Sequence, residues 1–177
     1  RNPEKLQRWN YELNQIRIPF KEQVLPKVRM LSEDELFDCD MFVFCASKGI
    51  PPVGMENVDV RMVQFEGNRE IISKYGRLAR EKGFKGIFAV VSDPVDPLCK
   101  ALFLESNKDV SGNMDYKGLA PNQIIGYGLG VMNARATFYS ELNGTINEYL
   151  RDGQVFGPHG IGLIVVNSIS NYNKALS

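Results

Sequence analysis

The residues of this sequence best suited to chemistry are its only histidine and two of its arginines. His159 lies between Pro158 and Gly160, in a glycine-containing turn that leaves an imidazole accessible. An imidazole exchanges protons near neutral pH, so His159 is a candidate acid or base. Arg61 stands where a long loop becomes a helix, and Arg135 stands on a later predicted helix, so either guanidinium could reach a site. Taken singly, such an arginine is more often a solvated charge, and such a histidine usually has no chemical role.

A continuous apolar run over residues 86–91 ends abruptly in the polar turn Ser92-Asp93-Pro94. The run predicts a strand buried on both faces, as in parallel sheets that helices cover on either side. Ligands of such sheets bind beyond the carboxyl ends of the strands, where Ser92 and Asp93 would face them. An ordinary core strand followed by an ordinary turn explains this stretch equally well.

Two further strands are predicted near 41–46 and 123–126, in the same sheet as 86–91. Because βα crossovers align the carboxyl ends of parallel strands, we expect Ala46, Ser47 and Asp93 at one edge. The glycine- and proline-rich segment after the first of these strands, from Ser47 to about residue 59, is typical of a lid or binding loop. It is equally typical of an ordinary surface loop.

Capping residues and helical spacing predict four helices. They begin near Asn2, Val60, Val95 and Gly130, and the second ends near Lys82. Its predicted buried residues are Val60, Val63, Ile71, Ile72, Tyr75, Leu78 and Ala79. Short strands are predicted at Val28–Leu31 and Ile161–Val166, and a surface loop at Asn107–Lys117.

Composition limits the classes of function. The 177 residues are 44% hydrophobic and carry 21 basic and 21 acidic side chains, which argues against a nucleic-acid or anionic-membrane partner. No apolar run approaches the roughly 20 residues that span a bilayer. The three cysteines lack metal-ligand spacing, so we predict no metal site and expect reduced, mostly buried cytoplasmic thiols. These are Cys39, Cys45 and Cys99.

Taken in order, the motifs resemble those of the L-lactate and malate dehydrogenase family. They are the glycine- and proline-rich loop with Arg61, then Asn68, Val-Val-Ser-Asp-Pro-Val-Asp, Ile-Ile-Gly-Tyr-Gly with Ala134-Arg135, and Gly-Pro-His-Gly. The resemblance implies an α/β fold: a Rossmann-type parallel sheet lacking its first βαβ portion, followed by the start of an α/β substrate domain. Residues 1–126 would form a partial NAD-binding domain and residues 127–177 the beginning of the catalytic domain. We therefore expect an internal part of a longer enzyme.

The resemblance also implies roles for individual residues. His159 matches the histidine that takes the hydroxyl proton as hydride leaves the substrate carbon. Arg135 matches the arginine that grips the substrate carboxylate as a bidentate pair, and Arg61 matches the mobile-loop arginine that polarises the reacting carbonyl. The cofactor would lie against Ala46, Ser47, Asn68, Val91 and Asp93. The implied cofactor is NAD, with NADP left open, and the implied partner is a small 2-hydroxy or 2-oxo acid in a cytoplasmic homo-oligomer, a dimer or a tetramer.

Three positions depart from the family pattern. Met132 stands where the family has the aspartate that orients the histidine, and Asp93 replaces an asparagine that contacts substrate. Pro51 falls near the position that separates lactate from malate enzymes and is neither glutamine nor arginine.

Two hypotheses remain open. One is a divergent NAD-dependent oxidoreductase for a 2-hydroxy or 2-oxo acid with an unusual, larger or cationic side chain. The other is a non-catalytic dehydrogenase-like nucleotide-binding or assembly module. Retention of His159 with both arginines favours the first, whereas Met132 with Asp93 favours the second.

Overall fold

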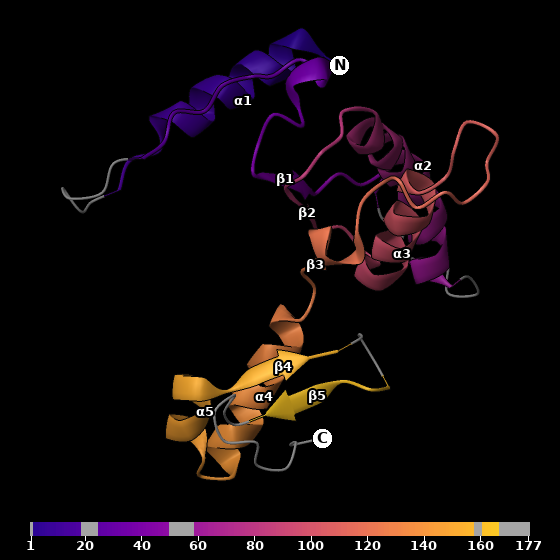
Figure 1. Ribbon diagram of the computed structural model, residues 1–177. Coiled ribbons are helices and arrows are strands. Elements are labelled where there is room, and N and C mark those ends of the chain that lie inside the picture. The colour runs from indigo at the N-terminus through magenta and orange to yellow at the C-terminus, as the bar shows by residue number, and fades with distance from the viewer. Residues whose placement is uncertain (1, 19–24, 50–58, 158–160, 167–177) are drawn as a thin grey trace. The chain divides into compact units, whose positions relative to one another are not determined.

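The computed structural model describes residues 2–18, 25–49, 59–157 and 161–166 (Figure 1). The backbone divides into two compact units, Arg1–Cys39 and Asp40–Ser177. The domain boundary expected after residue 126 lies within the second unit and stays a prediction.

The first unit contains helix α1, Pro3–Gln15, and the 3₁₀ turn η1, Glu33–Glu35. The side chain of Asn2 caps α1 by accepting a hydrogen bond from the amide of Lys5, which confirms the predicted start. The strand predicted at Val28–Leu31 is wrong. The Asn14 side chain accepts from the Val28 amide at 3.0 Å and donates to the Val28 carbonyl at 2.8 Å, so the backbone groups of Val28 are not free for strand pairing.

The second unit is built on a three-stranded parallel sheet in the order β1-β2-β3. The strands are β1 Met41–Phe44, β2 Ile87–Val90 and β3 Ile124–Gly126, which confirms the predicted parallel sheet. Phe88 and Val90 of the central strand are fully buried, as expected for a strand between two others. The unit is therefore an α/β fold.

Two helices form the crossovers between these strands. Helix α2, Val60–Glu81, joins β1 to β2, and α3, Val95–Ser106, joins β2 to β3. The two pack closely at Gly76, where an added Cβ would lie 3.0 Å from a Leu102 methyl carbon. Gly83 ends α2 with φ +62°, a conformation that glycine adopts without steric cost.

The predicted extent of α2 is confirmed, but its first two predicted core residues are wrong. Val60 and Val63 are exposed, whereas Ile72 and Ala79 are fully buried. The helix has 22 residues, while β1 and β2 have four each, so its first turns extend past the edge of the sheet.

The segment after α3 is tied into the core at its ends. Asn107, which we had placed in a surface loop, is 1% exposed. Its Nδ2 donates to the carbonyl of Leu119 at 2.9 Å, and its Oδ1 accepts from the amide of Gly118 at 2.9 Å. Between these ends, Arg80 makes a bidentate ion pair with Asp115, with both contacts at 2.6 Å.

The remaining elements form a smaller cluster of helices and a hairpin. They are α4 Gly130–Leu142, α5 Ile146–Asp152, β4 Gln154–Phe156 and β5 Ile164–Val166, with β4 and β5 antiparallel. Tyr149 is central to their core, together with Ala136 and Val165. Its hydroxyl donates to Asn133 at 2.7 Å. The strand predicted from residue 161 begins only at 164, and α5 and β4 were not predicted.

The cysteines are free, but the expectation that they are mostly buried is wrong. Cys39 and Cys45 are exposed, because one precedes β1 and the other follows it, where the chain leaves the core. Cys99 on α3 is partly buried.

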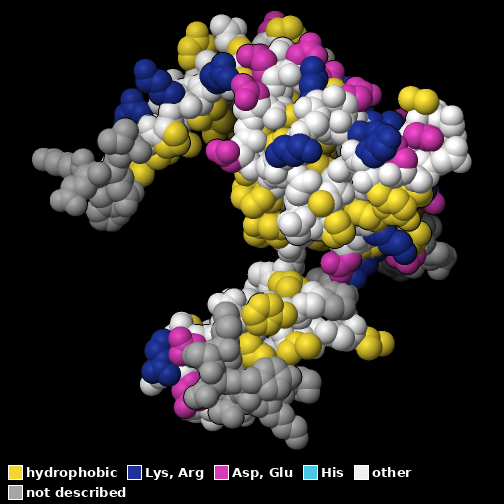
Figure 2. Space-filling model, in the orientation of Figure 1, with side chains coloured by type: hydrophobic (Ala, Val, Ile, Leu, Met, Phe, Trp, Pro, Cys, Tyr) yellow, Lys and Arg dark blue, Asp and Glu magenta, His cyan; other side chains and the backbone are white. Residues whose placement is uncertain are grey.

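Charges of both signs are mixed on the face seen in Figure 2. Among the ion pairs of this unit, Glu105 pairs with Arg77 at 3.0 Å and with Lys108 at 2.6 Å. In the part of the chain that the structure describes, no helix has the length and apolar character to cross a membrane.

The first testable prediction concerns Asn107. Asn107→Ala is expected to lower the free energy of unfolding by about 2–3 kcal/mol, because the Gly118 amide and Leu119 carbonyl lose buried partners. Urea denaturation measures the change. The control is Asn122→Ala at an exposed position, for which we expect less than about 0.5 kcal/mol. Equal effects of the two substitutions would contradict the anchoring role.

The second prediction concerns the acid dependence of stability. The hydrogen bonds from Arg80 lower the pKa of Asp115 to about 2. Because the carboxyl group has a pKa of about 3.9 in an unfolded chain, the pair stabilises the fold above that pH and loses its contribution as pH falls towards about 2.

Asp115→Asn is therefore expected to reduce the decrease in unfolding free energy between about pH 4 and about pH 2. Urea titrations across this range measure it. Glu141→Gln, which removes an exposed carboxylate of α4, is the control and should keep the wild-type slope. An unchanged slope in Asp115→Asn would show that the ion pair does not govern this range.

Candidate functional site

The carboxyl ends of β1 and β2 lie together, as expected for adjacent parallel strands. The buried Ser92 donates its hydroxyl hydrogen to the carbonyl of Ala46 at 2.8 Å. The amide of Val91 donates to the carbonyl of Phe44 at 2.9 Å, which continues the ladder one residue past β2. Ala46, Ser47 and Val91 are exposed at this edge, so a ligand can approach the backbone there.

Asn68 joins the two loops that leave these strands. Its side chain projects from α2 and the residue is 1% exposed. Oδ1 accepts from the Lys48 amide at 2.9 Å, and Nδ2 donates to the Asp93 carbonyl at 2.8 Å. One carboxamide therefore fixes the backbone after β1 and after β2.

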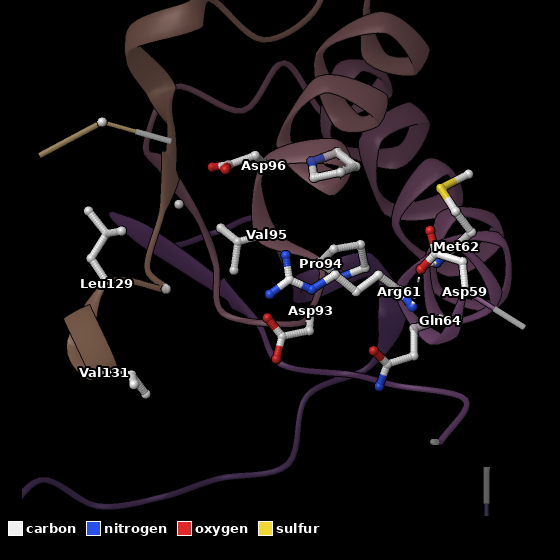
Figure 3. Close-up of a pocket in the computed structure, with 14 residues that line it drawn as sticks. Asp59, Arg61, Met62, Gln64, Asp93, Pro94, Val95, Asp96, Leu129 and Val131 are labelled. Atoms are coloured by element: carbon white, nitrogen blue, oxygen red, sulfur yellow. Dashed lines mark hydrogen bonds between the residues drawn. The ribbon is translucent and has the colours of Figure 1, made fainter. Parts of the chain in front are cut away.

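A cavity of about 580 Å³ lies beside this edge, within the size range typical of small-molecule sites (Figure 3). Three stretches supply most of its wall: the first turn of α2, the turn from β2 into α3, and the segment from the end of β3 into α4. The lining residues are Asp59, Arg61, Met62, Gln64, Asp93, Pro94, Val95, Asp96, Pro97, Gly126, Gly128, Leu129, Val131 and Gly157.

The polar groups of the cavity come from the starts of two helices. Asp59 caps α2 by accepting hydrogen bonds from the amides of Arg61 and Met62 at 3.0 and 3.3 Å. Figure 3 shows the Arg61 guanidinium extending into the cavity towards the side where Asp93 lies. The structure shows no ion pair between these two side chains, so both charges are available to a ligand.

Two glycines form part of the apolar wall because Val95 occupies the space beside them. A Cβ at Gly126 would lie 2.6 Å from one methyl carbon of Val95, and a Cβ at Gly128 would lie 2.9 Å from the other. Cys99 lies next to Gly126, and burial raises the pKa of its thiol to about 11. Cys99 is therefore protonated near neutral pH and is not a nucleophile.

The structure brings some of the predicted site residues together. Arg61 and Asp93 line the same cavity, and Asn68 holds the backbone of Asp93. Arg135 is exposed on α4 and is not among the lining residues, while Met132 on the same helix is partly buried. His159 and Pro51 lie outside the described residues, so the roles that the resemblance implies for Arg135 and His159 stay predictions.

Sequence reasoning missed several lining residues. Asp59 and Asp96 are acidic residues at helix starts, a signal that indicates capping and does not indicate a site. Gln64 lies on α2 one turn beyond Arg61, so helical spacing could have found it. No group of three or more potential metal ligands occurs among the described residues.

The comparisons with known proteins agree with the sequence resemblance. No protein-family model matches the chain. An L-lactate dehydrogenase from Mycoplasma pneumoniae is 32% identical over 105 residues, covering 58% of this chain and 29% of that enzyme.

Two solved structures share the fold. A minor L-lactate dehydrogenase from Enterococcus mundtii matches with a TM-score of 0.54 and 22% identity, over 76% of this chain and 38% of that chain. A malate dehydrogenase from Picrophilus torridus matches with a TM-score of 0.50 and 21% identity, over 75% and 36%. The chain thus spans 29% to 38% of the length of these relatives. Over part of its length, the chain is distantly related in sequence to that L-lactate dehydrogenase, and it shares a fold with the two solved structures.

Proposed function

We propose that the native protein containing this chain is an NAD-dependent oxidoreductase that interconverts a 2-hydroxy acid and a 2-oxo acid. The observation that carries the proposal is the convergence of the β1 and β2 carboxyl ends with Arg61 and Asp93 beside one cavity. Open parallel sheets bind ligands at this position, and the distant relationship to L-lactate dehydrogenase agrees with a hydroxy-acid substrate.

The residues at the sheet edge fit a dinucleotide. Ala46 and Ser47 are small and exposed, which allows a cofactor to approach the backbone, and Val91 offers an exposed apolar surface beside them. Asn68 would keep this surface in place, because its hydrogen bonds fix the loops on both sides. NAD would supply the hydride acceptor, and its reduced form the donor.

The chain's own residues would handle the charge and the proton. Arg61 extends into the cavity, where its guanidinium would stabilise the negative charge that develops on the substrate oxygen. Arg135 would pair with the substrate carboxylate and His159 would exchange the hydroxyl proton, the roles that the family resemblance implies. In oxidation His159 takes the proton, and in reduction it returns the proton.

A non-catalytic nucleotide-binding module is the second candidate. Met132 favours it, because the resemblance implies that His159 would lack a carboxylate partner there. Asp93 also favours it, because an ionised carboxylate repels a carboxylate substrate. Dinucleotide binding without turnover of any 2-oxo acid would support this candidate.

The third prediction tests Arg61 in the native protein. Arg61→Lys keeps the positive charge and loses the forked donor geometry, so we expect kcat for 2-oxo acid reduction to fall about 10²-fold or more. NADH oxidation with a panel of 2-oxo acids measures the loss. Arg69→Lys, on the exposed side of the same helix, should leave kcat unchanged. Wild-type kcat in Arg61→Lys would remove Arg61 from the mechanism.

The fourth prediction tests Met132. A carboxylate at this position would raise the pKa of His159, because a nearby negative charge favours the protonated ring. Reduction needs the protonated ring and slows as pH rises through that pKa, so Met132→Asp should move this decline to higher pH. We also expect a higher kcat, by as much as about 10⁴-fold where the orienting acid is fully restored.

The pH dependence of NADH oxidation measures both effects. Met132→Asn is the matched control without charge, and Asp93→Asn is combined with Met132→Asp so that repulsion of the substrate does not hide a gain. Brisk wild-type turnover that Met132→Asp slows, with no change in the pH profile, would show that proton transfer needs no acid at this position.

A further inference from the structure

Asp93 presents a carboxylate to the cavity that no other described group uses. This carboxylate accepts no hydrogen bond and forms no ion pair with the described residues, although Asp93 lines the cavity. Asp59 differs, because its Oδ1 is engaged as the cap of α2. The Asp93 side chain is therefore the acidic group of the cavity most available to a ligand.

The backbone that carries this carboxylate is held in place on both sides. The Asp93 carbonyl accepts from the 1%-exposed Asn68, and the preceding Ser92 is buried and bonded to Ala46. A charged group on a fixed backbone loses little conformational freedom when a ligand binds, which favours affinity and selectivity.

The charges around the cavity determine which ligands fit. Arg61 is the one basic side chain among the described lining residues, and it stands against the carboxylates of Asp59, Asp93 and Asp96. Arg61 can stabilise the negative charge that develops on the reacting oxygen of a ligand. A carboxylate on the side chain of the ligand would meet negative charge, whereas a cationic group would meet an unpaired counter-ion in Asp93.

The cavity also has room for a ligand larger than a three-carbon acid. About 580 Å³ lies in the middle of the range for drug-sized ligands, so a side chain of several carbons fits beyond the reacting carbon. A chain of this length would let a terminal cation reach Asp93 while the reacting oxygen lies at Arg61.

We infer that the substrate is a 2-hydroxy or 2-oxo acid whose side chain carries an amine or a guanidine, with Asp93 as the residue that selects it. This inference rests on the proposed function for the reacting end of the molecule. Asp93 lies at a solvent-exposed position, so the selectivity that it gives is moderate.

The experiment is isothermal titration calorimetry of the native protein with three six-carbon probes. They are zwitterionic 6-amino-2-hydroxyhexanoate, the monoanion 2-hydroxyhexanoate and the dianion 2-hydroxyhexanedioate. We expect the amine to bind about fivefold more tightly than the monoanion, as for one partly exposed ion pair, and the dianion to bind most weakly.

Asp93→Asn should bring the affinities for the amine and the monoanion to the same value, and Asp93→Ser provides a second variant if the first is poorly folded. Glu66→Gln removes an exposed charge of α2 that does not line the cavity, so it should keep the wild-type ratio. Equal binding by the wild type, an unchanged ratio in both Asp93 variants, or no binding of any probe would overturn the inference.

NAD-dependent oxidation of the same three acids separates this inference from the proposed function. Charge-selective binding without oxidation of any probe upholds the selection by Asp93 and overturns the oxidoreductase activity. Oxidation of the monoanion with no preference for the amine upholds the activity and overturns the selection.

Discussion

The arrangement of the candidate site depends on the two hydrogen bonds made by the Asn68 carboxamide. The parallel pairing of β1 and β2 brings their carboxyl ends together, but it does not determine where the chain goes next. Asn68 determines this, because it bonds the Lys48 amide and the Asp93 carbonyl from one side chain. Losing either bond would leave a polar atom of the 1%-exposed Asn68 without its partner.

Asn68 also helps to fix the positions of Arg61 and Asp93, the opposite charges of the cavity. Arg61 and Asn68 are seven residues apart on α2, close to two helical turns, so both project from one side of the helix. Asn68 contacts the loop that carries Asp93, while Arg61 extends into the cavity beside that loop. The separation between guanidinium and carboxylate is thus set by a rigid helix and a buried amide, and it does not depend on a contact between the two charges.

Helix starts explain how three carboxylates can surround one cavity. Asp59 caps α2 and Asp96 lies in the first turn of α3, so both face the positive end of a helix dipole. Their negative charge has a local structural reason. Asp93 precedes Pro94, the residue before α3, and its side chain does not cap the helix. Asp59 and Asp96 therefore stabilise helix starts, whereas the carboxylate of Asp93 can bind a ligand.

Much of the fold follows from local sequence, and the exceptions have identifiable causes. The central strand and the extent of α2 could be predicted because an apolar run, the cap Asp59 and the stop Gly83 are local signals. The strand at Val28 failed because Asn14, distant in sequence, takes its backbone hydrogen bonds. The short elements α5 and β4 have weak periodicity and depend on packing around Tyr149. Contacts between residues that are distant in sequence could not be predicted from local sequence signals.

The site shows the same division. Arg61 and Asp93 could be predicted because each adjoins the end of a recognisable element, whereas the close packing of Gly126 and Gly128 on Val95 is visible only in three dimensions. The family resemblance adds a relation between two departures. It implies an amide at Asp93 and a carboxylate at Met132, and this chain has a carboxylate at the first and none at the second. If both positions serve one reaction, an acid has been lost beside the proton carrier and another gained at the ligand. The site would then stabilise the imidazolium less and attract a cationic substrate more. Met132 and Asp93 would therefore have to be changed together to recover the behaviour of the relatives.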